Sequence, residues 1–210
     1  MKSFWKPILP PFRDYKKDIL SKQAEVGEFI YQIGETDTLR QTSPEIPIDK
    51  IAAPEYQEKF DYIKKCLIRY RKITGMGRGI TGVQVGIPEA FSVIYMPEIP
   101  QKTLIIINPK VTKRSKEIFT YPEMCMSAAP AIAKVARPSW IEFEYYGENG
   151  EKHIWNTKAD DALGKMYNRV FEHEIDHICG IINIDLIPSK DIIFESDPMF
   201  YKSATFTKVR

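Results

Sequence analysis

Two segments of the chain carry apolar residues at helical spacing. In the first, from about Glu55 to Ile73, basic residues take the remaining faces. Its apolar positions are Phe60, Ile63, Leu67, Tyr70 and Ile73. Side chains three and four positions apart lie on one face of a helix. The pattern therefore predicts an amphipathic surface helix over residues 55–73 that packs against a sheet.

The second helical segment begins near Thr157 and ends at Gly180. Its apolar positions are Leu163, Met166, Val170, Phe171 and Ile178. Thr157 or Asp160 is placed to cap the N-terminus, because a short polar side chain there can accept from free backbone N–H groups. Gly180 is placed to end the helix, because glycine adopts the left-handed conformation that commonly follows the last turn.

Strand patterns occupy the stretch between the two helices. Phe91–Met96 and Thr103–Pro109 are rich in β-branched and aromatic residues, and a glycine-rich segment precedes them. Residues 140–156 alternate in polarity around the turn Glu148-Asn149-Gly150, which predicts a hairpin. Strands followed by a helix are typical of an α+β domain.

Composition places the chain among ordinary folded proteins. It has 210 residues, 43% of them hydrophobic and 28% charged, with a formal net charge of +2. No strongly charged partner such as nucleic acid is demanded. The first residues lack the apolar core of a signal peptide, and no apolar run approaches the roughly 20 residues that span a bilayer. Three cysteines are too few for a disulfide framework, so a reducing cytoplasm is the expected setting.

Residues 171–180, FEHEIDHICG, contain an HExxH motif. His173 and His177 are four positions apart, so on a helix they share a face and can present imidazole nitrogens to one cation. Glu174 lies beside the first histidine, where it can take a proton from a metal-bound water and return it to a leaving group. The motif predicts a metal-dependent hydrolase.

The third metal ligand decides the class of enzyme. Asn183 completes the pattern HExxHxxGxxN, which departs from a zinc peptidase signature only at its last position, although an amide is a poor ligand for zinc. Glu195 offers a more distant carboxylate, and Cys125 offers a soft thiolate. Asn183 or Glu195 would predict an HExxH metallopeptidase that cleaves internal peptide bonds. A metal-stabilised binding module without catalysis is a further hypothesis.

Three segments in order resemble the motifs of the peptide deformylases. They are GRGITGVQ at 77–84, EMCMS at 123–127 and EHEIDH at 172–177, and the family motifs run roughly GxGxAAxQ, EGCLS and QHExDH. The resemblance covers about Phe29 to Ser189. It implies an α+β fold in which antiparallel or mixed β-sheets surround a central metal-binding helix that carries HExxH. It also implies hydrolysis of the N-formyl group from the initiator methionine of nascent polypeptides, with release of formate.

The resemblance carries a set of site residues over to this chain. The implied metal ligands are Cys125, His173 and His177. They would bind one divalent ion, commonly iron(II), which nickel, cobalt or zinc can replace. Glu174 would act as general base and then as acid. Gln84 and the backbone N–H of Met126 would donate hydrogen bonds to the developing oxyanion.

The expected substrate-binding positions depart further from the family motifs. They are Gly79, Ile80, Met124 and Ile132. Met124 stands where the family has glycine, so it adds a side chain to the groove and would be strained if a positive φ were needed. Ile132 replaces a residue that is often basic. Thr81-Gly82 replaces two alanines, and Glu172 replaces a glutamine, which adds a carboxylate beside the metal helix.

Five other residues receive structural interpretations. Cys66 and Cys179 lie on the predicted helices and are expected to be small core residues. His153 is expected to be an exposed residue of the hairpin. Glu123 and Arg137 are predicted to pair across adjacent strands and to orient the cysteine of the second motif.

The predicted organisation has three parts. Residues 1–28 form a leader that packs on the body, residues 29–190 form a deformylase-like metal-hydrolase domain, and residues 191–210 form a C-terminal tail. The expected partners are N-formylmethionyl peptides, with a transient contact to the ribosome. No membrane and no specific nucleic acid is expected to bind.

Overall fold

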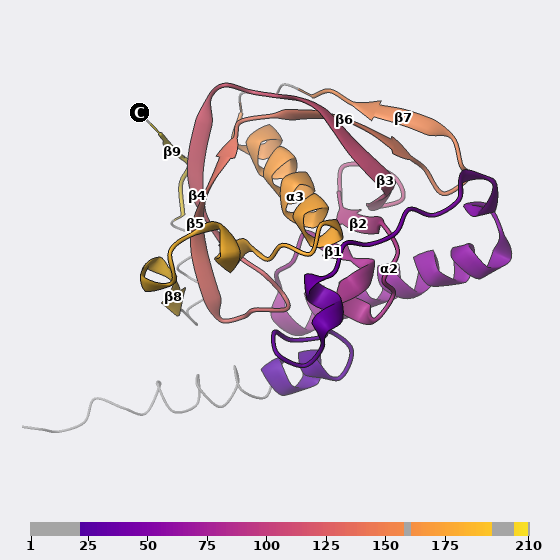
Figure 1. Cartoon of the computed structure of the whole chain (residues 1–210), viewed down its shortest axis with the longest axis horizontal. Helices are drawn as coiled ribbons and strands as arrows, with labels where there is room; N and C mark the ends of the chain where they lie inside the picture. The colour runs from indigo at the N-terminus through magenta and orange to yellow at the C-terminus, as the bar shows by residue number, and fades with distance from the viewer. Residues whose placement is uncertain (1–21, 158–160, 195–203, 210) are drawn as a thin grey trace, which may run out of the picture.

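The computed structural model describes residues 22–157, 161–194 and 204–209. In these ranges the chain forms a five-stranded sheet, a four-stranded sheet and two long helices, and every strand pairing is antiparallel (Figure 1). The prediction of an α+β fold with antiparallel sheets is confirmed.

The five-stranded sheet has the order β1-β2-β3-β6-β7. Its strands are β1 (Gly79–Thr81), β2 (Phe91–Tyr95), β3 (Thr103–Arg114), β6 (Ile141–Tyr146) and β7 (Lys152–Trp155). The four-stranded sheet has the order β8-β5-β4-β9. Its strands are β4 (Ile118–Met124), β5 (Ala131–Pro138), β8 (Ile193–Phe194) and β9 (Thr207–Lys208). The five 3-10 turns are η1 (Asp37–Arg40), η2 (Ile48–Lys50), η3 (Gly82–Val85), η4 (Asn183–Leu186) and η5 (Ser189–Asp191).

Helix α2 (Pro54–Thr74) covers one face of the five-stranded sheet. Proline at its first position costs no hydrogen bond, and Gly75, with φ of 73°, ends it in the left-handed conformation. Phe60 of this helix meets Phe91 of β2 edge to face, with ring centroids 5.0 Å apart. The predicted helix over residues 55–73 is confirmed.

Helix α3 (Ala162–Ile178) lies on the opposite face of the same sheet. Successive residues of β3 divide between the faces, because Ile105 and Ile107 pack with α2 while Ile106 packs with α3. Phe171 of α3 anchors the helix against Phe143 of β6, with ring centroids 5.0 Å apart. The remaining side of α3 faces the four-stranded sheet, so the helix lies between the two sheets (Figure 1).

The ends of α3 differ from the prediction. Asp161 is the N-cap, in place of Thr157 or Asp160, and its carboxylate accepts from the Gly164 N–H at 2.6 Å. Cys179 is the C-cap, and Gly180 follows it with φ of 76°. A Cβ at Gly180 would lie 2.5 Å from the Arg40 carbonyl oxygen, so the glycine allows η1 to pack closely on the end of the helix.

The strand predictions are largely confirmed. β2 and the hairpin β6–β7 occupy the expected segments, and β3 extends five residues beyond Pro109 because it continues to pair with β6. Cys66 is buried and His153 is exposed, as expected. Cys179 is exposed, so its interpretation as a core residue is wrong. Within the described part of the chain, neither helix has the length and apolar character that a membrane span requires.

Both ends of the chain are only partly described. The predicted leader falls mainly on residues 1–21, which lie outside the described residues. In the predicted tail, Phe194 pairs with Ala131 of β5 and Thr207 pairs with Thr120 of β4. Both strands thereby add to the four-stranded sheet.

Candidate functional site

Three potential metal ligands from two distant segments meet between the sheets. Cys125 follows the last residue of β4, and His173 and His177 lie one turn apart on α3. One ligand atom from each lies within 4.8 Å of the others, and Cys125 Sγ is 3.1 Å from His177 Nε2. Cys125 and His177 are fully buried. One thiolate and two imidazoles are a donor set that suits iron(II) or zinc.

Hydrogen bonds hold the side chains of the cluster in place. Cys125 Sγ accepts from the Ser127 N–H at 3.4 Å and from Gln84 Nε2 at 3.6 Å. His173 Nδ1 lies 3.1 Å from Glu123 Oε2, which leaves Nε2 to face the other ligands. Burial lowers the pKa of His173, but its hydrogen bonds to Cys125 and Glu123 raise that pKa well above the ordinary value. The pKa of His177 moves the other way, well below the ordinary value, because its ring is buried beside His173. The cluster therefore pairs an imidazole that favours positive charge with one that stays neutral.

Glu123 is the centre of a buried ionic network behind His173. Its carboxylate accepts from Arg137 Nε at 2.7 Å and Nη2 at 3.0 Å, and it also pairs with Arg169. Arg137 reaches Asp176 as well, at 2.7 Å. Burial raises the pKa of Glu123, but Arg137 and His173 together hold that pKa far below its usual range. The predicted pairing of Glu123 with Arg137 is confirmed, and the Glu123 carboxylate contacts His173. That the pair orients Cys125 stays a prediction.

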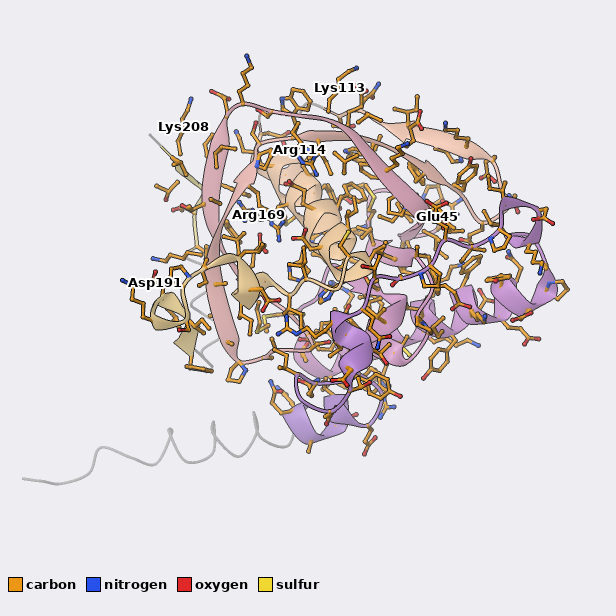
Figure 2. The ribbon with its side chains drawn as sticks, viewed as in Figure 1. Glu45, Lys113, Arg114, Arg169, Asp191 and Lys208 are labelled. Carbon is orange, nitrogen blue, oxygen red and sulfur yellow. The ribbon has the colours of Figure 1, made fainter. Side chains whose placement is uncertain are left out.

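Arg169 is a member of this network that sequence reasoning missed. Figure 2 shows it between α3 and the long strands β4 and β5. Besides Glu123 it donates to the carbonyl oxygens of Val135 at 3.0 Å and Phe119 at 2.7 Å. Its spacing along α3 gave one signal, since Arg169 lies four positions before His173 and so shares that helix face.

Glu174 is buried beside β1. Its Oε2 accepts from the Thr81 hydroxyl at 2.7 Å, and burial raises the pKa of this carboxyl group. A Cβ at Gly79 would lie 2.3 Å from Glu174 Oε1, so only glycine leaves room for the carboxylate. A buried carboxylate with a raised pKa is suited to accept and return a proton near neutral pH. Thr81, which replaces an alanine of the family motif, therefore holds this carboxylate in place through its hydroxyl group.

Gln84 joins the first and second motifs. Its Oε1 accepts from the Thr81 N–H at 2.9 Å, and its Nε2 donates to Ser127 Oγ at 3.1 Å and to the Cys125 sulfur. The side chain is 1% exposed. Gln84 therefore connects the segment that contains Cys125 and Ser127 to Thr81 of β1, and the Thr81 hydroxyl in turn binds Glu174.

A cavity of about 340 Å³ opens beside the cluster. Its walls come from the end of α2 and the segment leading into β1, from β4, and from α3. Six predicted site residues line it: Gly79, Gln84, Met124, Met126, His173 and Glu174. The other four, Ile80, Cys125, Ile132 and His177, are each 0% exposed and do not line it.

The departures from the family motifs have clear structural outcomes. Met124 does not have a positive φ, so methionine is not strained there, and its side chain forms part of the cavity wall. Ile132 pairs with Met124 across the β4–β5 ladder, and it is buried and does not line the cavity. Burial raises the pKa of Glu172 to about 8. This carboxyl group is buried on α3, one residue before His173.

The alternative third ligands are placed differently. Asn183 Nδ2 donates to the Glu123 carbonyl oxygen at 2.9 Å, so this amide is bound to the backbone of β4. Glu195 lies outside the described residues. Cys125 is the cysteine that the fold brings to the two histidines.

Comparison with known proteins gives one consistent family. The family model described as polypeptide deformylase matches residues 28–192. A peptide deformylase of Prochlorococcus marinus is 31% identical over 169 residues, which cover 77% of this chain and 74% of the relative. One from Agrobacterium fabrum is 35% identical over 113 residues, which cover 53% of this chain and 63% of the relative, less than two thirds of its length.

Solved structures agree with this assignment. A probable peptide deformylase from a Synechococcus phage superposes with a TM-score of 0.64 at 28% identity, covering 75% of this chain and 98% of that one. A Met-Ala-Ser-bound peptide deformylase from Acinetobacter baumannii gives a TM-score of 0.62 at 19% identity, covering 75% and 96%, and shows the same fold. With the family model matching most of its length, this chain belongs to the peptide deformylase family.

Proposed function

We propose that this protein is a metal-dependent amide hydrolase that removes the N-formyl group from the initiator methionine of nascent polypeptides and releases formate. The observation that carries the proposal is the convergence of Cys125, His173 and His177 beside Glu174 at one cavity. Family membership supports the same reaction. A cytoplasmic setting and a transient contact with the ribosome follow from such a substrate.

The buried, convergent donor set fits one divalent ion, which Cys125, His173 and His177 would hold. We propose iron(II) as the native ion. Zinc, nickel or cobalt could replace it, because a thiolate with two imidazoles accepts all of them. When bound, the ion supplies a Lewis acid that polarises a carbonyl oxygen and lowers the pKa of water. Glu123 would keep His173 in the orientation and tautomer that binding requires.

The chain's own residues would carry out the proton transfers. Glu174 accepts a proton from the attacking water and returns it to the nitrogen of the departing amine. Thr81 keeps the carboxylate aimed at that position. The Met126 N–H and Gln84 Nε2, which would exchange its long hydrogen bond to the Cys125 sulfur, would donate to the oxygen on which negative charge develops. Loss of such a donor typically costs about 10²–10³ in rate.

The cavity suits a short extended peptide. β1 is the edge strand of its sheet, so its backbone, including Ile80, is available to pair with a peptide backbone. Gly79 and Met124 would contact the substrate, and Ile132 would support Met124 from the neighbouring strand, on the same face of the sheet. The Acinetobacter baumannii structure with Met-Ala-Ser bound supports a peptide occupant.

The test is formate release under anaerobic conditions. Protein with a measured iron content should release formate from formyl-Met-Ala-Ser, and Glu174→Gln should keep the metal while losing at least about 10² in kcat. Cys125→Ser should lose both metal and activity, whereas an HExxH peptidase would retain both. Stoichiometric metal with no formate from any formyl peptide would reject the proposal.

A further inference from the structure

Two arginines without a carboxylate partner lie in the cavity wall. Arg71 is in the last turn of α2, and Arg78 immediately precedes β1. Both side chains are half-buried. Across the described residues neither guanidinium forms an ion pair, whereas Arg169, the third arginine of this wall, is paired with Glu123.

Neutral groups hold the two arginines in position. The Arg71 guanidinium lies over the Tyr95 ring, 3.7 Å from its centroid, and donates to the Gly77 carbonyl oxygen. Arg78 Nη1 donates to the Tyr167 hydroxyl at 3.2 Å. These contacts orient each guanidinium without cancelling its charge. A guanidinium has five N–H donors, so both arginines keep donors for a further partner.

The nearby acids do not neutralise this pair. Glu123 is paired with two other arginines, and Glu174 is held by the Thr81 hydroxyl beside the metal ligands. Glu98 accepts from the Tyr167 hydroxyl to which Arg78 donates, and its carboxylate attracts Arg78, but it is exposed, so water and salt screen this attraction. The wall formed by Arg71 and Arg78 therefore has excess positive charge.

The distance from the reaction centre matches a residue downstream of methionine. Arg78 directly precedes Gly79, where an added Cβ would lie 2.3 Å from Glu174 Oε1, and the Arg78 side chain reaches Tyr167. Tyr167 precedes His173 by six residues on α3, which is about 9 Å along the helix at 1.5 Å per residue. An extended peptide advances about 3.3 Å per residue, so this point is at the level of its second or third residue.

We infer that Arg71 and Arg78 form a carboxylate subsite that selects formyl peptides with Asp or Glu at the second or third residue. The inference rests on the proposed function and specifies the substrate class of the same site. A planar guanidinium binds a carboxylate through two parallel hydrogen bonds, and partial burial strengthens that attraction. Peptides with a neutral or basic side chain at the same position would leave the positive charge uncompensated.

The test compares peptides that differ in one side chain. Metal-loaded protein is assayed for formate release from formyl-Met-Ala-Glu-amide, its Gln and Lys counterparts, and the same series with the variable residue second. We expect kcat/KM to be about tenfold higher for Glu than for Gln, mainly through KM, with the advantage shrinking as salt is raised. Formyl-Met-Ala-Gln with a free C-terminus separates a terminal from a side-chain carboxylate. A gain confined to that peptide would overturn side-chain selection.

Variants assign the preference to the two arginines. Arg71→Gln and Arg78→Gln should each reduce the Glu-to-Gln ratio, and the double variant should bring it close to one. Arg71→Lys and Arg78→Lys keep the charge with less change in packing, and should retain part of the ratio. Arg114→Gln is the matched control, because Arg114 is an exposed arginine at the end of β3, outside the cavity wall (Figure 2). An unchanged ratio in the double variant would overturn the inference.

A binding measurement separates this inference from the proposed function. If no peptide releases formate, deformylation is rejected, and calorimetry with Met-Ala-Glu-amide and Met-Ala-Gln-amide decides the carboxylate subsite alone. Tighter binding of the Glu peptide that Arg78→Gln abolishes would support the subsite. Equal binding of the two peptides would overturn it, as would equal kcat/KM when formate is released.

Discussion

At Gly79, a missing side chain gives Glu174 the space that it occupies. A Cβ there would lie 2.3 Å from Glu174 Oε1. We expect Gly79→Ala to displace the carboxylate and lower kcat by about 10² or more, because small misplacements of reacting groups have effects of this size. Formate release checks the rate, and a thermal melt checks the fold. Gly27→Ala, where a Cβ meets nothing within 4 Å, should leave the rate unchanged.

Thr81 holds the same carboxylate through a single hydroxyl group. Its Oγ1 donates to Glu174 Oε2 and lies 2.8 Å from Ser92 Oγ. Thr81→Val has nearly the same shape without the donor, so kcat should fall about 10- to 100-fold, the scale of a hydrogen bond to a charged group. Thr81→Ser restores the hydroxyl and should recover most of the rate in the same assay. Equal rates for Val and Ser would show that the hydroxyl does not position Glu174.

At the scale of elements, β4 and α3 are joined by the ion pairs of Glu123. Its buried carboxylate forms ion pairs with Arg137 of β5 and with Arg169 of α3. Glu123→Gln leaves the buried Arg169 without a carboxylate partner and Arg137 with Asp176 alone, so the free energy of unfolding should fall by about 3–5 kcal/mol. Urea unfolding measures the change. Glu117→Gln, which breaks an exposed pair with Lys208, should change the stability little.

Local spacing and long-range contact explain which elements and site residues could be predicted. The two histidines lie four positions apart on a periodic helix, so their shared face followed from the sequence alone. Cys125 follows β4, about 50 residues before the histidines, and only the resemblance of three motifs linked it to them. Arg169 meets Glu123 through the tertiary packing of α3 on β4, which helical spacing does not specify. β8 and β9 are two-residue strands, too short to show an alternating pattern.

At the scale of the whole molecule, the end of the chain supports the cavity wall. The Phe206 ring lies 4.7 Å from that of Tyr121, which lines the cavity, and Arg169 lies 5.7 Å from the Phe206 ring. Phe206→Ala should therefore lower the free energy of unfolding by about 1–2 kcal/mol and raise KM for formyl peptides. Val209→Ala, at an exposed position beyond β9, is the control. An unchanged KM would show that the chain end does not support the wall.

The proposed metal ion should also stabilise the whole fold, because its ligands join α3 to the end of β4 in the four-stranded sheet. An ion that binds only the folded state adds about 2.7 kcal/mol when its free concentration is 100 times the Kd. Treatment with a chelator should therefore lower the melting temperature by several degrees, and iron(II), zinc or nickel should restore it. Cys125→Ser should abolish this response. Cys179→Ser, which changes an exposed cysteine at the C-terminal end of α3, should keep it. A melting temperature that does not respond to metal in the unmodified protein would contradict a bridging role for the ion.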